Sequence, residues 1–274
     1  MVLTRRAALK GLVVTAVGAV TGAATYGVAY ERHHIIVTET DLPVYGLPPS
    51  LDGLRIGFVT DIHHSELVPA DDVQRAVDLV RDIQPDLVVL GGDYVTRSDR
   101  AYMQPVAELL APLTAPLGVF AIVGNHDDDR EMPAALTKVG FTVLKDQRTE
   151  LNVRGEQLTI AGIRFWTRRA EDIARVLRGA AGTTLMLAHD PRRLTEAAAL
   201  NVPAVLAGHT HGGQVVLPGY GAVAKTRFPV IAGLGTQENT TMFVSRGIGT
   251  VYVPIRINCP PEVAVVTLRS RRRA

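Results

Sequence analysis

The sequence predicts an α/β fold, because apolar runs of strand length alternate with amphipathic segments of helix length. The clearest example is the segment from Asp72 to Gln84, which places apolar residues three and four positions apart and ends at Pro85. A succession of strand, helix, strand, helix and strand is typical of a parallel sheet. The first five elements are expected as strands at 54–60, 86–90 and 118–123 and helices at 72–84 and 101–111.

The second half of the chain repeats this order, which predicts a second sheet packed against the first, with helices on the flanks. We expect helices at 131–139, 171–178 and 192–199, strands at 141–144, 149–153, 157–163, 183–188 and 204–207, and β structure with long loops over 214–268. Residues 31–53 lead into this domain of residues 54–268. An edge strand at 35–38 is expected there, with Pro43 breaking the segment after it.

The first thirty residues are predicted to be a targeting segment rather than part of the fold. Thr4 to Lys10 resembles the twin-arginine export signature, and residues 11–30 carry no charge. About 20 apolar residues suffice to span the ~30 Å hydrocarbon core of a bilayer. A cleaved signal and a retained membrane anchor are both compatible with this pattern. The twin-arginine resemblance predicts export by that machinery to the extracytoplasmic face of the membrane, the periplasm or the cell wall, and an ordinary membrane anchor is the alternative.

The net charge and the cysteine count limit which classes of protein the chain can belong to. A net charge of +2 in 274 residues does not require a nucleic-acid partner, and we expect none. Cys259 is the only cysteine, which excludes an intrachain disulfide and a cysteine-based zinc finger. Residues 269–274 form a basic tail, for which a solvated segment and contact with an anionic membrane surface are the two interpretations.

Polar residues gather where the predicted strands end. The carboxyl ends of parallel strands lie on one rim of a sheet, so these side chains should converge. Carboxylate, amide and imidazole ligands suit Mn, Fe or Zn, and seven ligands suit two ions that share a bridging carboxylate. Residues two apart in a strand point the same way, which would let Asp61 and His63 reach one ion. The seven possible ligands are Asp61, His63, Asp93, Asn125, His189, His209 and His211, and His126 lies beside Asn125 in the same set of strand ends.

The order of these motifs resembles the calcineurin-like metallophosphoesterases over roughly residues 54–268. The matching motifs are Asp61-x-His63, Gly91-Gly92-Asp93, Gly124-Asn125-His126-Asp127, the lone His189, and Gly208-His209-Thr210-His211. The resemblance implies a two-sheet β-sandwich with the active site at the carboxyl ends of its strands. It also implies two divalent metal ions, one held by Asp61, His63 and His211 and the other by Asn125, His189 and His209, with Asp93 as the bridge.

The same resemblance assigns the remaining roles. His126 would be the catalytic acid or electrophile, oriented by Asp127. The segment 245–249, Arg256 and Pro261-Glu262 are similar to an exported or membrane-tethered bacterial phosphodiesterase branch, some members of which act on UDP-diacylglucosamine. Arg256 is accordingly predicted to contact substrate. His64 is an addition to the first motif, for which lining the substrate pocket and an exposed loop histidine are the two interpretations. Ser65 departs from the family pattern, where glycine is usual.

The function predicted from the sequence is hydrolysis of a lipid- or wall-linked phosphodiester of the cell envelope by a hydroxide held between two metals. Two alternatives stay open at this stage. One is a phosphomonoesterase on the same scaffold, since the motifs do not separate monoesters from diesters. The other is a non-catalytic envelope protein that binds metal.

Overall fold

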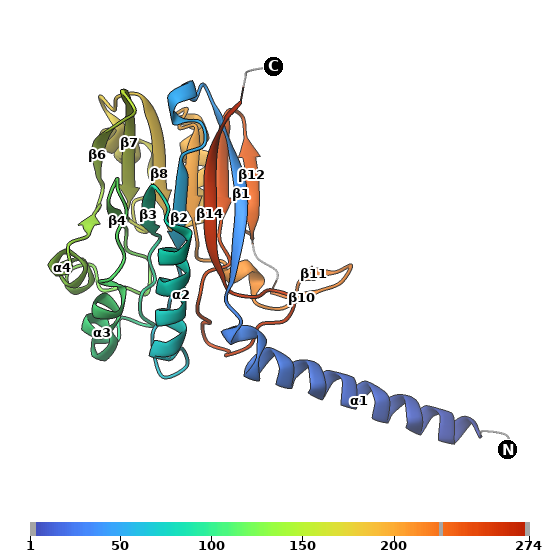
Figure 1. Ribbon diagram of the computed structural model, residues 1–274. Coiled ribbons are helices and arrows are strands. Elements are labelled where there is room, and N and C mark those ends of the chain that lie inside the picture. Colours follow the sequence, from blue (N-terminus) through green and yellow to red (C-terminus); the bar gives the residue numbers. More distant parts are fainter. Residues whose placement is uncertain (1–3, 225–226, 272–274) are drawn as a thin grey trace.

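The computed structural model describes residues 4–224 and 227–271, and it folds them into two six-stranded sheets packed face to face (Figure 1). The predicted two-sheet α/β fold is confirmed. In the first sheet the strand order is β1-β14-β2-β3-β4-β5. Its strands are β1 (Ile36–Tyr45), β14 (Glu262–Arg271), β2 (Arg55–Val59), β3 (Leu87–Leu90), β4 (Val119–Ala121) and β5 (Thr142–Val143).

The second sheet has the order β12-β13-β9-β8-β7-β6. Strands β7, β8, β9 and β13 run parallel, and β6 and β12 close the two edges in the antiparallel sense. The strands are β12 (Gly233–Gln237), β13 (Thr240–Val244), β9 (Ala204–Ala207), β8 (Thr183–Ala188), β7 (Glu156–Ile163) and β6 (Gln147–Val153), and a separate hairpin joins β10 (Val216–Leu217) to β11 (Gly221–Ala222).

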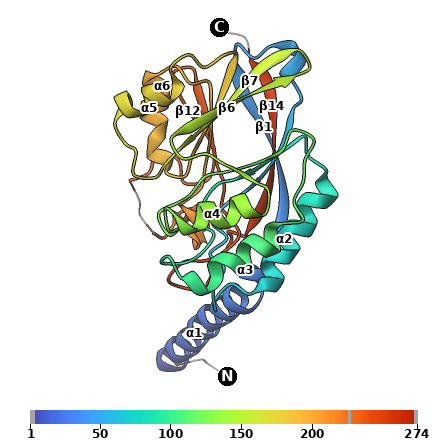
Figure 2. The same cartoon turned by 90° about the vertical axis from the view of Figure 1, so that its left-hand side faces the viewer.

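Helices cover the outer face of each sheet (Figure 2). Three of them pack on the first sheet and two on the second, and four short 3₁₀ turns complete the elements. The helices are α1 (Arg5–Ala29), α2 (Ala70–Ile83), α3 (Arg100–Leu110), α4 (Glu131–Lys138), α5 (Ala170–Leu177) and α6 (Leu194–Ala199), and the turns are η1 (Glu31–His33), η2 (Pro49–Leu51), η3 (Pro191–Arg193) and η4 (His211–Gly213).

The central strands are apolar throughout because both of their faces are buried. In β3, Val88 and Leu90 point toward the helices, whereas Leu87 and Val89 point into the space between the sheets. This alternation follows from the two-residue period of a strand. It also explains why the sequence shows continuous apolar runs here rather than alternating ones.

Strand β1 corrects the predicted lead-in. It is ten residues long, pairs in parallel with β14 and continues through Pro43, which was expected to break it. An edge strand tolerates proline because one side of it needs no N–H donor, and β1 lies at the edge of its sheet. The predicted basic tail likewise begins inside β14, which extends to Arg271. Residues 272–274 lie outside the described residues.

Helix α1 extends away from the sandwich instead of packing on it (Figure 1). Among the described residues, one helical segment, Leu9–His33, is long and apolar enough to cross a membrane, and only 6% of its most apolar window is buried. A signal sequence near an N-terminus satisfies the same criterion.

Candidate dinuclear metal centre

The polar residues predicted to converge do so at one end of the sandwich. The loops after β2, β3 and β4 approach from the first sheet, and those after β8 and β9 approach from the second. Two groups of possible metal ligands result, and within each group the ligand atoms lie within 4.8 Å of one another. The inner cluster is Asp61, His63 and His211, and the outer cluster is Asp93, His189 and His209.

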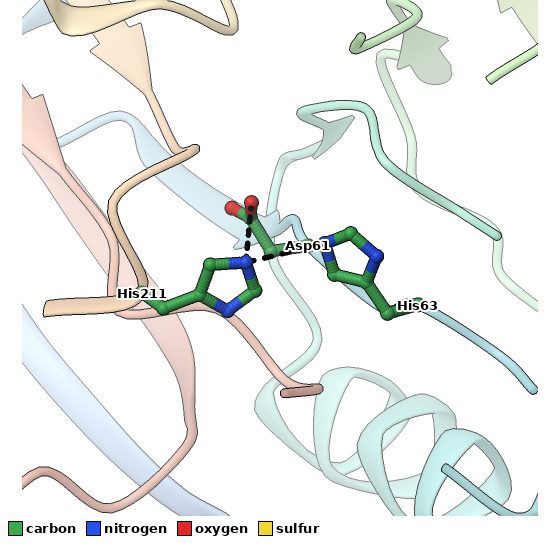
Figure 3. Close-up of side chains that lie close together, drawn as sticks. All are labelled: Asp61, His63 and His211. Atoms are coloured by element: carbon green, nitrogen blue, oxygen red, sulfur yellow. Dashed lines mark hydrogen bonds and ion pairs between the residues drawn. The ribbon is translucent and has the colours of Figure 1, made fainter. Parts of the chain in front are cut away.

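The inner cluster is fully enclosed by protein. His63 Nε2 lies 3.2 Å from His211 Nε2, which in turn lies 3.4 Å from Asp61 Oδ1. Figure 3 shows these three side chains facing one another although they come from distant parts of the sequence. All three residues are buried, so their lone pairs have little access to water.

The outer cluster is built around His189. Its Nδ1 is 2.8 Å from the Gly91 carbonyl oxygen and donates to it, which leaves Nε2 facing Asp93 Oδ2 at 3.1 Å. The His209 ring packs edge to face on His189 with centroids 5.1 Å apart. His209 is the only half-buried member of the two clusters.

Asp93 lies between the clusters. One of its carboxylate oxygens, Oδ2, is 3.1 Å from His189 Nε2 and 3.5 Å from His63 Nε2. The other oxygen, Oδ1, accepts a hydrogen bond from the His126 backbone N–H at 2.8 Å. A single carboxylate thus faces both clusters, as a bridging ligand does.

Asn125 gives an independent test of whether these residues fit metal. Its Oδ1 is buried and has no hydrogen-bond partner among the described residues. A buried polar atom without a partner is costly and rare in a folded protein. A cation would satisfy the Asn125 oxygen, and together with the carboxylates and imidazoles of the two clusters this donor set fits a pair of divalent metals.

The backbone at this end is strained in a way the sequence did not reveal. Asp61, His63, Asp93, His209 and His211 all have positive φ angles between 51° and 74°. Such conformations cost energy in residues other than glycine and concentrate at functional sites. Asp61 and His63 lie in one cluster, as expected for residues that would share an ion, but strand alternation is not the reason. Both residues lie beyond the end of β2, so strand alternation does not align them.

Two motif glycines are required by close packing against the carboxylates. A Cβ at Gly124 would lie 2.1 Å from Asp93 Oδ1, and one at Gly208 would lie 2.3 Å from Asp61 Oδ2. Either contact would displace a carboxylate from its cluster. This explains why glycine precedes Asn125 and His209 in the two motifs.

Comparison with known proteins identifies the family. The sequence pattern of the calcineurin-like phosphoesterases matches residues 54–213. The chain belongs to the calcineurin-like phosphoesterase family. This family uses two divalent metals, and the two clusters fit such a dinuclear site. The chain is 31% identical to the metallophosphoesterase YkuE of Bacillus subtilis over 98% of both chains.

Two further sequence relatives and one solved structure are also similar to this phosphoesterase. It is 31% identical to phosphodiesterase YaeI of Escherichia coli, over 78% of this chain and 82% of YaeI. A zebrafish transmembrane protein with a metallophosphoesterase domain is 30% identical, over 96% of this chain and 63% of that protein. The TT1561 protein of Thermus thermophilus shares the fold, with a TM-score of 0.52 at 12% identity over 72% of this chain and 90% of that one.

In this phosphoesterase, electrostatics divides the histidines into two classes. Burial lowers the pKa of His63 to about 3 and that of His209 to about 4, and it also lowers the pKa of His211. Burial would lower the pKa of His189 as well, but the carboxylates of Asp93 and Asp61 outweigh it and raise that pKa to about 10. Three imidazoles are therefore neutral near pH 7, the form that binds metal, whereas His189 is protonated before metal arrives.

His126 lies at the entrance to the clusters, with its ring edge to face on His63 at 4.9 Å. Its Nδ1 accepts a hydrogen bond from the Arg97 backbone N–H at 3.1 Å, which leaves the proton of the neutral ring on Nε2. Its carbonyl oxygen accepts from the Ser98 N–H at 2.7 Å. Backbone hydrogen bonds thus orient the imidazole so that its Nε2–H can donate. Residue types alone do not reveal these backbone contacts.

The predicted role of Asp127 is corrected. Its carboxylate does not contact the His126 ring. It accepts hydrogen bonds from the backbone N–H groups of Asp93, Tyr94 and Gly124 at 2.8, 2.8 and 2.9 Å. Burial and the nearby Asp93 raise the Asp127 pKa to about 7. Asp127 therefore ties together the two loops that carry Asp93 and His126.

Arg256 and His64 are also placed differently from the prediction that they contact substrate. The Arg256 side chain is fully buried, and it donates to the carbonyl oxygens of Arg246, Gly247, Gly249 and Cys259. Arg256 thereby shapes the loop beside His211. His64 is buried, with Nδ1 2.9 Å from the Val68 carbonyl oxygen and its ring edge to face on Tyr102.

Aromatic residues that the motifs do not include flank the site. Phe165 and Phe228 lie 5.3 and 5.2 Å from the His209 ring, beside the outer cluster. Tyr252 lies 6.0 Å from the His126 ring on the opposite flank and is 64% exposed. Trp166 is 65% exposed, packs edge to face on Phe165 and carries the Arg168 guanidinium over its ring at 5.4 Å.

Proposed function

We propose that the protein hydrolyses a phosphodiester at the metal centre formed by the inner and outer clusters. The observation that carries this proposal is the position of Asp93, whose single carboxylate faces both clusters while its second oxygen holds the backbone of His126. This arrangement joins the metal ligands and the proposed proton donor in one unit.

The proposed ligand assignment follows the clusters and the unpaired Asn125 oxygen. Asp61, His63 and His211 would hold one ion, Asn125, His189 and His209 would hold the other, and Asp93 would be shared by both. Mn, Fe and Zn all suit this mixture of oxygen and imidazole ligands. Bound divalent cations supply Lewis-acid polarisation of phosphoryl oxygens and lower the pKa of a water molecule toward neutrality.

His126 is the proposed donor to the phosphoryl or leaving-group oxygen. Its Nε2 proton is directed by the hydrogen bond that Arg97 makes to Nδ1. A positioned donor of this kind stabilises charge that develops on oxygen in the transition state. The ring is nearly buried, which strengthens that interaction by excluding water.

Preference for a diester is supported by the name of the Escherichia coli relative, a phosphodiesterase. The location is proposed from the N-terminus, where Arg5 and Arg6 of the twin-arginine signature begin α1. A vertebrate relative is a transmembrane protein. We therefore place the enzyme on the extracytoplasmic side of the membrane, exported by the twin-arginine route, with a lipid- or wall-linked diester as substrate.

The test uses the full chain in detergent micelles, stripped of metal and then supplied with Mn²⁺. Rates on bis-p-nitrophenyl phosphate and p-nitrophenyl phosphate are compared, with His126→Ala as the control for contaminating enzymes. Mn²⁺-dependent preference for the diester supports the proposal. Preference for the monoester would favour a phosphomonoesterase, and two bound metals without activity on either ester would favour a non-catalytic metal-binding protein.

A further inference from the structure

Two segments beside the site expose apolar side chains and carry no charge. Residues 208–224 and 247–255 contain no Asp, Glu, Lys or Arg. The first includes the β10–β11 hairpin, where Leu217, Tyr220 and Val223 are 44%, 57% and 46% exposed. The second includes Tyr252 and Val253, which are 64% and 57% exposed. We call these five residues the apolar rim.

Hydrogen bonds join the end of α1 to Arg256, which directly follows the second segment, and join the first segment to the neighbouring Ile257. The Arg256 backbone N–H donates to the Gly27 carbonyl oxygen at 3.2 Å, and the Val216 N–H donates to the Ile257 oxygen at 2.9 Å. The approach to α1 is close, since a Cβ at Gly27 would lie 2.5 Å from the Arg256 oxygen. Figure 1 shows the hairpin and α1 on the same side of the sandwich.

The end of α1 has the composition of a membrane interface. Tyr26 and Tyr30 are about half exposed, and their rings lie 5.3 Å apart. Tyrosine at the end of an apolar helix is typical of the headgroup level of a bilayer. Ile255, the last residue of the second segment, and the adjacent Arg256 lie against Gly27 at this end of α1.

The apolar rim also reaches the metal centre. The Tyr252 ring lies 6.0 Å from the His126 ring and carries the exposed Arg97 guanidinium over its face at 5.3 Å. The second segment therefore runs from Ile255, beside the end of α1, to Tyr252, beside the proposed proton donor, where the Arg97 guanidinium lies over the tyrosine ring. A phosphate joined to a lipid tail matches this sequence of an apolar surface, a cation and a metal pair.

We propose that the apolar rim rests in the interfacial layer of the membrane that α1 enters, so that the enzyme takes a phosphodiester whose lipid end stays in the bilayer. The inference rests on the proposed function. Isolated exposed apolar residues are ordinary on a protein surface, but a patch of them marks an interaction site. Aromatic and aliphatic side chains without acidic neighbours suit the headgroup and acyl boundary.

The contact is tested without reference to activity. Tyr220→Trp is made in a Trp166→Phe background, so that it is the one tryptophan of the full chain, and the protein is reconstituted in phosphatidylcholine vesicles. Leu234→Trp in the same background is the matched control, because Leu234 is 46% exposed on edge strand β12, outside both segments. Brominated lipid should quench the tryptophan at 220 and not the one at 234. Quenching of both tryptophans by aqueous iodide, with none by brominated lipid, would overturn the proposal. Protection of the tryptophan at 220 by self-association of the protein would overturn it as well.

The substrate class is tested with the variant Leu217→Ser/Tyr220→Ser/Val253→Ser, which leaves His126 and the clusters intact. Its rate on phosphatidyl-p-nitrophenol in vesicles should fall at least about tenfold, because binding to the interface weakens as buried apolar area is lost. Its rate on soluble bis-p-nitrophenyl phosphate should stay within about twofold of wild type. Equal rates on the lipid ester for variant and wild type would contradict the inference. A wild type that hydrolyses neither substrate would instead overturn the proposed function. The quenching result would still show whether the apolar rim contacts the bilayer.

Discussion

The inner and outer clusters use similar ligands in different environments. All three residues of the inner cluster are buried, and its two imidazoles are kept neutral by burial. The outer cluster is half open at His209, and its central His189 carries a proton that two carboxylates stabilise. The inner cluster is therefore ready to accept a cation, whereas the outer cluster must first release a proton.

The difference between the clusters indicates that the Asp93 carboxylate serves two functions. Asp93 stabilises the protonated His189 before metal arrives, and in the proposed centre it becomes the bridge between the ions. The outer site should therefore be the weaker and more exchangeable of the two. Its open side is flanked by Phe165 and Phe228, where substrate would approach.

The largest expected effect comes from removing the residue that both clusters share. Asp93→Ala should abolish metal binding at the outer cluster and weaken it at the inner cluster. It should lower kcat/KM by about 10⁴-fold or more, since ion binding and the position of His126 are lost together. Metal content and diester hydrolysis are measured on the same sample. Asp78→Ala, on the exposed face of α2, is the control and should change neither. Near-normal turnover of Asp93→Ala would contradict the assignment.

A smaller effect is expected at His126, which belongs to neither cluster. His126→Ala should retain both metals and lower kcat by about 10²–10⁴-fold, the usual contribution of a positioned acid. Metal analysis and steady-state kinetics check this, with His34→Ala as an exposed control. Loss of metal from His126→Ala would show that its role is ligation rather than proton donation.

Arg256 offers a way to weaken the inner cluster alone. Arg256→Met removes the donor to four buried carbonyl oxygens in the loop beside His211 and should lower the free energy of unfolding by about 2–4 kcal/mol. Inner-site affinity should fall about 10–100-fold, as it does when residues that support metal ligands are lost. Thermal unfolding and metal titration test this, with exposed Arg269→Met as the control. A selective loss at the outer site would contradict the structural role.

The smallest expected effect is in the pH dependence of metal binding. The His189 pKa is raised to about 10, so near pH 7 the ring must lose about one proton when the outer site fills. Outer-site affinity should fall about tenfold for each pH unit of acidification below about 9, and inner-site affinity should change less. Calorimetry in buffers of different ionisation enthalpy counts the released protons. His189→Asn keeps an oxygen ligand and should release about one proton fewer, and equal release by both proteins would refute the assignment.

The fold and the convergence of the cluster residues could be predicted because they depend on patterns within the sequence. Buried apolar strands and the polar residues after them place Asp93 and His189 at one rim, whatever the loops do. The length of β1 could not be predicted, because a proline is tolerated there only by the edge position that β14 creates. The orientation of His126 could not be predicted either, since it depends on a backbone N–H of Arg97.

Arg256 shows a different limit. A cationic residue in a phosphoesterase suggests phosphate binding, but burial and carbonyl acceptors decide its role, and neither is visible in residue type. Asp127 was misjudged for the same reason, because its partners are backbone groups of Asp93, Tyr94 and Gly124. Side chains that bond to backbone leave no signature in a single sequence.

The central claim is a pair of unequal metal sites that share Asp93, and metal content tests it most directly. Full-length protein is stripped of metal and titrated with Mn²⁺ at pH 7, and bound metal per chain is measured by elemental analysis for wild type and His209→Ala. We expect two ions per wild-type chain, filled in two steps of different affinity, and one ion in the variant. A wild type that binds a single ion, or a variant that still binds two in the same two steps, would contradict it.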